Sequence, residues 1–262
     1  MNSRKRRPFA FVIFLVLVVS LLCVCGSLIL QRFAKETAEQ TTSEAIAPIE
    51  WDEQRAPNYY EVIGPANFEG GHLPPATTTL EPGDVAYGEL DHLGRATGTV
   101  AYVDAPLMEA GRARERESVS DLSPSGWGYN EESDIVTPTG DVYHGFFWNR
   151  SHLLAKSLGG EEVIENLVCG TRMQNVGANL NGTEGGMAYP ESLARDWLEQ
   201  HPDGTVRYAA TPIYHDDEAV CRCVVVDVLS SDGAINCEVM VYNAAKGYAI
   251  DYRDGSFRAA YV

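Results

Sequence analysis

The chain has 262 residues, of which 45% are hydrophobic, and this composition excludes an intrinsically disordered chain. Its 20 Lys and Arg residues against 37 Asp and Glu residues give a formal net charge of −17. This balance excludes a protein that holds nucleic acid mainly by bulk electrostatic attraction, although an acidic chain can still gather its few basic residues around one cleft.

The first predicted element is a membrane anchor over residues 1–30. Four consecutive basic residues at 4–7 precede an uncharged run of 22 residues at 9–30. That run can span a bilayer of about 30 Å, and the basic cluster predicts a cytoplasmic N-terminus. A cleaved signal peptide is the alternative, but the run lacks the A-x-A pattern of a cleavage site at its end. We therefore predict a single-pass signal anchor in the cell membrane, with the rest of the chain extracellular.

Residues 31–96 are predicted to be an extracytoplasmic linker or stalk. They contain polar, Thr- and Pro-rich stretches such as 40–43 and 74–79, and their hydrophobic periodicity is weak. Four cysteines lie further along the chain, at 169, 221, 223 and 237, in a compartment where disulfides can persist. Their pairing stays open, and their spacing does not favour a zinc site.

Regular elements are predicted from residue 97 onward. Strands are expected where β-branched and aromatic residues are dense, at 97–104, 142–148, 205–214, 219–229 and 234–242. Helices are expected at 153–158, 171–180 and 190–200, the last with a proline at its first position. A hairpin turn is expected at 230–233. Strands largely separated from helices predict an α+β domain over 97–262, built on a mainly antiparallel sheet.

Four polar residues stand out within these elements. His152 lies where a predicted strand ends and a short helix begins, and Asn166, Asn175 and Glu191 follow at intervals of 14, 9 and 16 residues. Asparagine has poor helix propensity, so Asn175 inside a predicted helix indicates a role beyond helix formation. Taken singly, each residue also fits a structural role, with His152 at a helix start and the asparagines as caps.

From residue 97 to the C-terminus, the chain resembles the DNA/RNA non-specific endonucleases of the ββα-metal type, especially secreted nucleases of Gram-positive bacteria. The family's Asp-Arg-Gly-His signature corresponds to Asn149-Arg150-Ser151-His152. Its Asn-Leu-x-x-Gly-Thr-Arg-x-x-Asn segment corresponds to residues 166–175, and the Met-Ala-Tyr-Pro-Glu block at 187–191 resembles the one that supplies a further acid. Several blocks in the same order are more specific than one motif. The departures are Asn149 and Ser151, which replace Asp and Gly.

The resemblance implies a ββα-metal nuclease domain and a set of site residues. His152 is expected to act as the general base that takes a proton from water. Asn175 is expected to bind Mg²⁺, with Mn²⁺ as the alternative metal. By the same resemblance Glu191 positions water at the metal, and Asn166 supports the site.

Three arginines complete the predicted site. Arg150 and Arg172 can hold the substrate phosphate through bidentate hydrogen bonds, although Arg172 fits a structural ion pair equally well. Arg116 is chosen, from the group that includes Arg112 and Arg114, as the arginine that stabilises the transition state.

The implied activity is a metal-dependent, sequence-non-specific endonuclease that cuts DNA outside the cytoplasmic membrane, with RNA as a further candidate substrate. Two alternatives remain open. One is a non-catalytic surface receptor that binds DNA for uptake, which the acidic charge disfavours. The other is an exported nuclease toxin, which requires cleavage of the predicted anchor. No protein partner is predicted.

Overall fold

The computed structural model describes residues 49–68, 80–115, 119–177 and 182–260. The predicted membrane anchor, at residues 1–30, lies outside these ranges. Within them, no helix combines the length and the apolar character needed to cross a bilayer.

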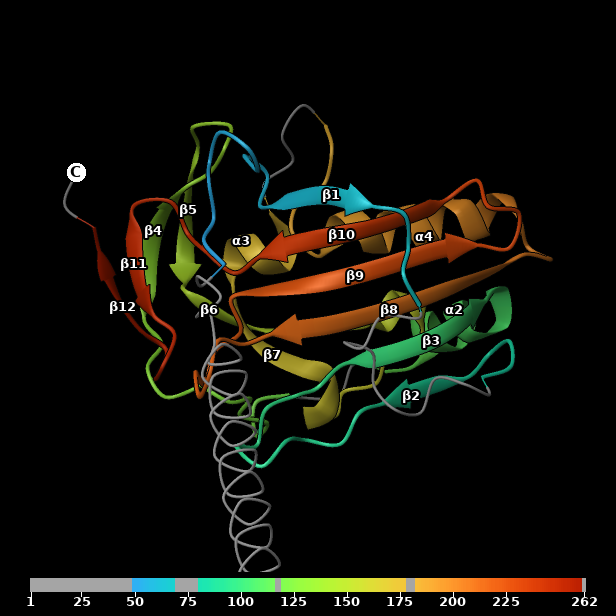
Figure 1. Ribbon diagram of the computed structural model, residues 1–262, viewed down its shortest axis with the longest axis horizontal. Helices are drawn as coiled ribbons and strands as arrows, with labels where there is room; N and C mark the ends of the chain where they lie inside the picture. The colour runs from blue at the N-terminus through green and yellow to red at the C-terminus, as the bar shows by residue number, and fades with distance from the viewer. Residues whose placement is uncertain (1–48, 69–79, 116–118, 178–181, 261–262) are drawn as a thin grey trace, which may run out of the picture. The chain divides into compact units, whose positions relative to one another are not determined.

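A six-stranded antiparallel sheet forms the centre of the described fold (Figure 1). In spatial order its strands are β1 (Tyr60–Gly64), β10 (Asn236–Tyr242), β9 (Cys223–Ser230), β8 (Thr205–Ile213), β3 (Thr99–Asp104) and β2 (Val85–Tyr87). The valine-rich β9 is buried along nearly its whole length, as expected for β-branched residues in a central strand. The predicted turn between β9 and β10 is present, and Gly233 adopts φ 75° there. The prediction of an α+β fold on a mainly antiparallel sheet is confirmed.

The folded domain begins before residue 97, so the predicted linker over 31–96 is wrong for its described parts. Strand β1 pairs with β10, and β2 pairs with β3, which makes them the two edges of the sheet. Tyr59, directly before β1, is buried and stacks on Trp51 with ring centroids 4.5 Å apart. Backbone hydrogen bonds to β10 and β3 hold these two short strands in the sheet. Their sequences therefore need no strong alternation of polar and apolar residues, and the strands were not predicted.

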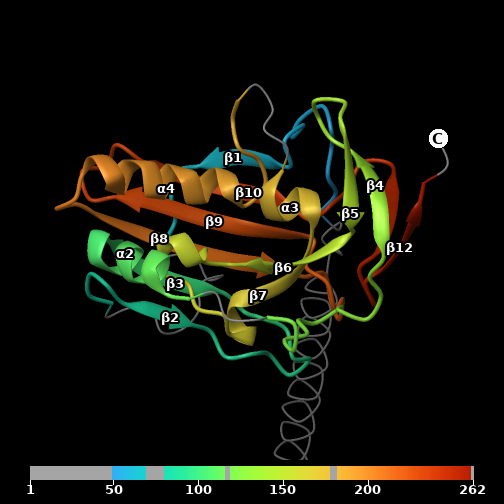
Figure 2. The ribbon, with the colours of Figure 1, turned by 180° about the vertical axis from the view of Figure 1, so that it is seen from behind.

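Two helices cover one face of the sheet, α2 (Ala105–Ala113) and α4 (Ala188–Gln200), as Figure 2 shows. Helix α4 matches the helix predicted at 190–200 and buries Ala194, Trp197 and Leu198 against the sheet. Helix α2 was not predicted from the sequence. Its start is capped by Asp104, whose side chain accepts a hydrogen bond from the Leu107 N–H at 2.8 Å.

The same face carries a hairpin followed by a short helix: β6 (Trp148–His152), β7 (Leu167–Thr171) and α3 (Arg172–Val176). This β-β-α order is the one that the resemblance implies. Two further hairpins pack at one end of the sheet, β4 (Glu132–Val136) with β5 (Val142–Phe146), and β11 (Tyr248–Asp251) with β12 (Ser256–Ala259). Aromatic side chains join the hairpins, since the buried Phe147 ring stacks on Phe257 with centroids 3.8 Å apart.

Three predicted elements differ from the structure for local reasons. The strand predicted at 142–148 is divided into β5 and β6 at the buried Phe147. The helix predicted at 153–158 is reduced to a 3₁₀ turn, η2 (Lys156–Leu158), because the Asn166 side chain takes the backbone N–H and C=O of Leu154. The helix predicted from 171 ends at Val176, because Gly177 adopts φ 57°. The four cysteines beyond the predicted anchor are free thiols.

Candidate active site

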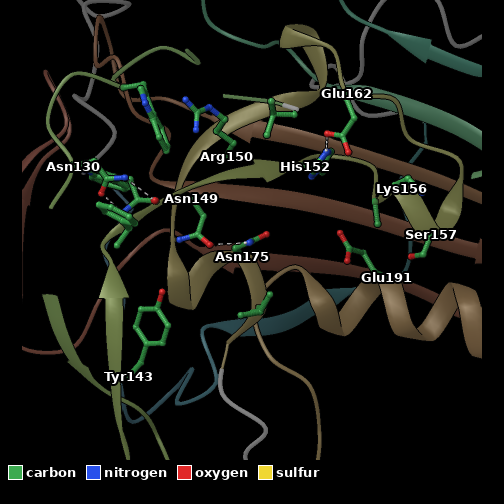
Figure 3. Close-up of a pocket in the computed structure, with 16 residues that line it drawn as sticks. Asn130, Tyr143, Asn149, Arg150, His152, Lys156, Ser157, Glu162, Asn175 and Glu191 are labelled. Atoms are coloured by element: carbon green, nitrogen blue, oxygen red, sulfur yellow. Dashed lines mark hydrogen bonds and ion pairs between the residues drawn. The ribbon is translucent and has the colours of Figure 1, made fainter. Parts of the chain in front are cut away.

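A cleft of about 790 Å³ brings together four of the predicted site residues, His152, Asn175, Glu191 and Arg150 (Figure 3). His152 comes from the end of β6, Asn175 from α3, and Glu191 from the first turn of α4. The β6–β7 pairing sets the position of His152, which lies opposite Leu167. Helix α3 follows β7 directly, so it carries Asn175 to the same cleft as the histidine.

The His152 imidazole is held by a carboxylate that was not predicted from the sequence, that of Glu162. Its Nε2 lies 2.7 Å from Oε2 of Glu162, and the two side chains are only 15% and 3% exposed. Because a carboxylate accepts hydrogen bonds, Nε2 is the donor of this pair. The lone pair of a neutral imidazole is then on Nδ1, which has no hydrogen-bond partner among the described residues. The pair therefore orients the histidine as a base whose accepting atom is Nδ1.

Asn166 supports this pair from behind and does not line the cleft. It is fully buried, and its Oδ1 accepts from the Leu154 N–H at 2.9 Å. Its Nδ2 donates to the Leu154 carbonyl at 3.0 Å and to the Glu161 carbonyl at 2.9 Å. These bonds fix the segment between His152 and Glu162. Asn166 is thus a positioning residue, which is compatible with the supporting role expected from the sequence.

Asn175 is oriented by the two residues that depart from the family signature. Its Oδ1 accepts from the Ser151 hydroxyl at 3.2 Å, and its Nδ2 donates to Oδ1 of Asn149 at 3.3 Å. Only the Ser151 bond uses Oδ1, and an amide oxygen has two lone pairs, so this atom keeps capacity for a further partner. Asn149 and Ser151 lie on β6, the strand that also carries His152. This strand therefore links the position of Asn175 to that of His152.

Oxygen donors in the cleft fit a hard divalent cation. The Asn175 amide oxygen and the Glu191 carboxylate are ligand types that Mg²⁺ or Mn²⁺ accepts. The described residues contain no cluster of three His, Cys, Asp or Glu side chains that could hold a metal ion. That finding does not oppose a magnesium site, because this ion keeps several waters and needs few protein ligands.

Glu191 occupies an environment that favours its neutral form in the absence of a cation. Burial raises the pKa of this carboxyl to about 8, with Arg195 opposing the rise and Glu184 adding to it. A bound cation would lower this pKa, because a nearby positive charge favours the ionised carboxylate.

Arg150 lines the cleft, but its guanidinium is committed to the protein. It donates to the backbone carbonyls of Ser120 and Leu122 and lies over the Trp127 ring, 4.1 Å from the centroid. These contacts hold the 119–127 segment against β6. The geometry therefore favours a bracing role over the predicted phosphate contact.

Arg172 is the better placed arginine for an anion. Its guanidinium lies over the Tyr143 ring, 5.1 Å from the centroid, and forms no ion pair with another described residue. It lines a smaller pocket of about 340 Å³, which shares Tyr143 and Val176 with the main cleft. The structural ion pair considered from the sequence is not found within the described part of the chain.

Arg116 lies outside the described residues. The two other arginines considered for the transition-state role already have partners in the protein. Arg114 donates to the carbonyls of Gly159 and Gly160, and Arg112 pairs with Glu199.

Residues 76–232 match the family model described as DNA/RNA non-specific endonuclease. A deoxyribonuclease from Streptococcus dysgalactiae subsp. equisimilis is 31% identical over 239 residues, which cover 76% of this chain and 72% of that protein. The chain belongs to the DNA/RNA non-specific endonuclease family.

Solved structures agree with this assignment. The structure of Sda1 nuclease with bound zinc ion is 30% identical with a TM-score of 0.72, and the match covers 80% of this endonuclease and 100% of that chain. The metal-free structure of NucA from Streptococcus agalactiae has a TM-score of 0.53 at 25% identity, over 68% of this chain and 78% of its own. The magnesium-bound NucA structure has a TM-score of 0.54 at 23% identity, over 70% and 83%.

Glu162 could not be found from spacing in this endonuclease, because it lies in the irregular segment between η2 and η3 (Ile164–Asn166). We expect Glu162→Ala to lower kcat by about 10–100-fold with little change in KM, because the nearly buried Glu162 side chain acts through its bond to His152. Glu162→Gln should retain more activity, since its amide oxygen can still accept from Nε2. Steady-state kinetics on a DNA substrate measure both values.

The control for Glu162 is Glu161→Gln, which removes a neighbouring exposed carboxylate and should leave kcat unchanged. A Glu162→Ala protein with unaltered kcat, or one whose loss is entirely in KM, would contradict the positioning role.

Glu191→Gln should change how stability depends on pH. A carboxyl whose folded-state pKa is raised penalises the fold when it ionises, so without metal the wild type loses stability as pH rises from about 4.5 to about 8. The glutamine variant lacks this loss and should be about 1–3 kcal/mol more stable than the wild type at pH 8, and nearly equal to it at pH 4. Urea unfolding in chelator at the two pH values measures the difference, and an equal difference at both would contradict the raised pKa.

Proposed function

We propose that this endonuclease is metal-dependent, cuts DNA without sequence specificity, accepts RNA as a second substrate, and acts outside the cytoplasmic membrane. The observation that carries the proposal is the single cleft in which a carboxylate-held histidine faces the amide oxygen of Asn175 and the carboxylate of Glu191. A phosphodiester needs an activated water and stabilisation of charge on phosphorus, and these groups supply both.

His152 begins the proposed reaction by accepting the proton of an attacking water at Nδ1. Glu162 keeps the ring in the tautomer that leaves this atom free and stabilises the imidazolium that forms. Asn166 keeps Glu162 in place, and Arg172 holds a substrate phosphate at the neighbouring pocket. Asn175 and Glu191 would hold the divalent cation, which supplies charge stabilisation at the phosphate oxygens and at the leaving oxygen.

Mg²⁺ is the proposed cation, with Mn²⁺ as the alternative. The support is the oxygen-only donor set, which hard cations prefer, and the presence of a divalent ion in the similar Sda1 nuclease structure, where that ion is zinc.

Supercoiled plasmid provides the direct test of the proposal. A fragment covering Pro48–Val262 is the suitable protein, because it keeps β1 and β2, whereas a fragment beginning at 97 would lose both edges of the sheet. We expect nicking followed by degradation to a smear in Mg²⁺ or Mn²⁺. Discrete, sequence-defined fragments would oppose the lack of specificity, and an absence of cutting in either ion would oppose metal-dependent catalysis.

For localisation we propose an anchored protein with an extracellular catalytic domain. The support is the basic cluster at 4–7 followed by the uncharged run at 9–30. Full-length protein should then fractionate with membranes, and protease added to intact cells should release an active domain. Recovery of a mature chain in the medium would indicate secretion after cleavage instead.

A further inference from the structure

Phe146 is a large apolar side chain that stays exposed inside the cleft. It is 56% exposed, and it lines the same cleft as His152 and Asn175. Its backbone is held firmly, because Phe146 pairs with Glu132 across the β4–β5 hairpin and the next residue, Phe147, is buried and stacked on Phe257. The pairing therefore fixes the backbone of Phe146 at the edge of the cleft, and its exposed side chain is one of those that line it.

The other partly exposed aromatic residues of the cleft are already in contact with charged side chains. Trp127 lies under the Arg150 guanidinium, Tyr143 lies under that of Arg172, and both rings also pack against the smaller hydrophobic core. Within the described residues, Phe146 has neither a ring partner nor a cation above it, and it belongs to neither hydrophobic core. Its faces are thus available to a ligand in the cleft.

We propose that Phe146 stacks on a nucleobase of the bound substrate next to the scissile phosphate, so that the enzyme prefers unpaired strands over duplex. The inference rests on the proposed function of the cleft and names its substrate class. A phenyl ring can stack on any base, which fits cleavage without sequence preference. The bases of an intact duplex are stacked on one another and present only their edges, so the ring would find no partner there.

The charge around Phe146 supports the same preference. Glu132 lies directly opposite it, and Glu131 and Asp134 lie on the same hairpin or just before it. Of these, Asp134 is paired with His144, while the other carboxylates disfavour phosphate close to the ring, and stacking on an unpaired base is uncharged. In a chain with a net charge of −17, stacking is a source of affinity that does not depend on attraction to phosphate.

The test compares one oligonucleotide as a single strand and as a duplex, cut by the Pro48–Val262 protein. Phe146→Ala should raise KM for the single strand by about tenfold, the scale of losing one stacked base, with kcat changed less than about twofold. Cleavage of the duplex should change by less than about twofold, and Phe146→Trp should behave as the wild type. Val142→Ala is the matched control, since it removes another apolar side chain of β5 that is 59% exposed but does not line the cleft.

A binding measurement separates stacking from catalysis. In the slow-cutting His152→Ala background, an oligonucleotide containing 2-aminopurine should lose fluorescence on binding, and adding Phe146→Ala should abolish that quenching. Equal effects of Phe146→Ala on both substrates, no effect on either, or unchanged quenching would overturn the inference. A wild-type protein that cuts neither substrate would instead refute the proposed function, so the two failures are distinguishable.

Discussion

Replacing His152 by alanine is expected to reduce the cleavage rate by about 10²–10⁴-fold, the range for loss of a general base. The histidine lines the cleft and bonds to the protein through Nε2, so the change removes the base and leaves the strand pairing of β6 intact. The rate of plasmid nicking under single-turnover conditions measures the effect. Circular dichroism checks that the fold persists.

Two further variants make this result interpretable. His152→Ala leaves the buried Glu162 without its partner, which can lower stability, so His152→Gln, whose amide can still donate to Glu162, serves as the second inactive variant. His144→Ala is the matched control, because His144 bonds to Asp134 on the exposed face of the β4–β5 hairpin and does not line the cleft. A folded His152→Ala or His152→Gln protein with near-normal activity would refute the assignment of the base.

Replacing Asn175 by alanine is expected to abolish cleavage at low Mg²⁺ while changing the free energy of unfolding by only about 1 kcal/mol. Asn175 makes two long hydrogen bonds, at 3.2 and 3.3 Å, so little folding energy depends on it. A cation held by so few protein ligands also contributes little to folding. Chelator should therefore stop cutting without a large change in melting temperature, and added Mg²⁺ should restore the wild type but not the variant.

Asn166→Ala separates the metal role from a structural one. This side chain is fully buried and bonds to Leu154, Glu161 and Thr99, so its loss should cost about 2–4 kcal/mol in the free energy of unfolding. If chelator unfolds the protein, the metal is structural. If Asn175→Ala cuts normally at low Mg²⁺, Asn175 is not the ligand.

Local sequence determined much of the fold and the motif of the site. The strands after residue 200 are dense in β-branched residues and appear close to where they were predicted, as does α4. The resemblance around residues 149–175 correctly indicated a β-β-α unit that brings His152 and Asn175 into one cleft, which Glu191 also lines. Local propensity and the order of the motifs predict these strands, helix α4 and the β-β-α unit, because residues close together in the chain determine them.

Contacts between distant segments decided the remainder. The edge strands β1 and β2 exist through hydrogen bonds to β10 and β3, so their own weak pattern indicated a linker. Arg150 and Arg172 are alike in sequence, but one is bound to carbonyls of the 119–127 segment and the other is left open beside the cleft. Glu162 bonds to His152 across an irregular segment whose backbone Asn166 holds at Leu154 and Glu161. Hydrogen-bond partners of this kind are chosen by three-dimensional proximity, which spacing along an irregular segment does not encode.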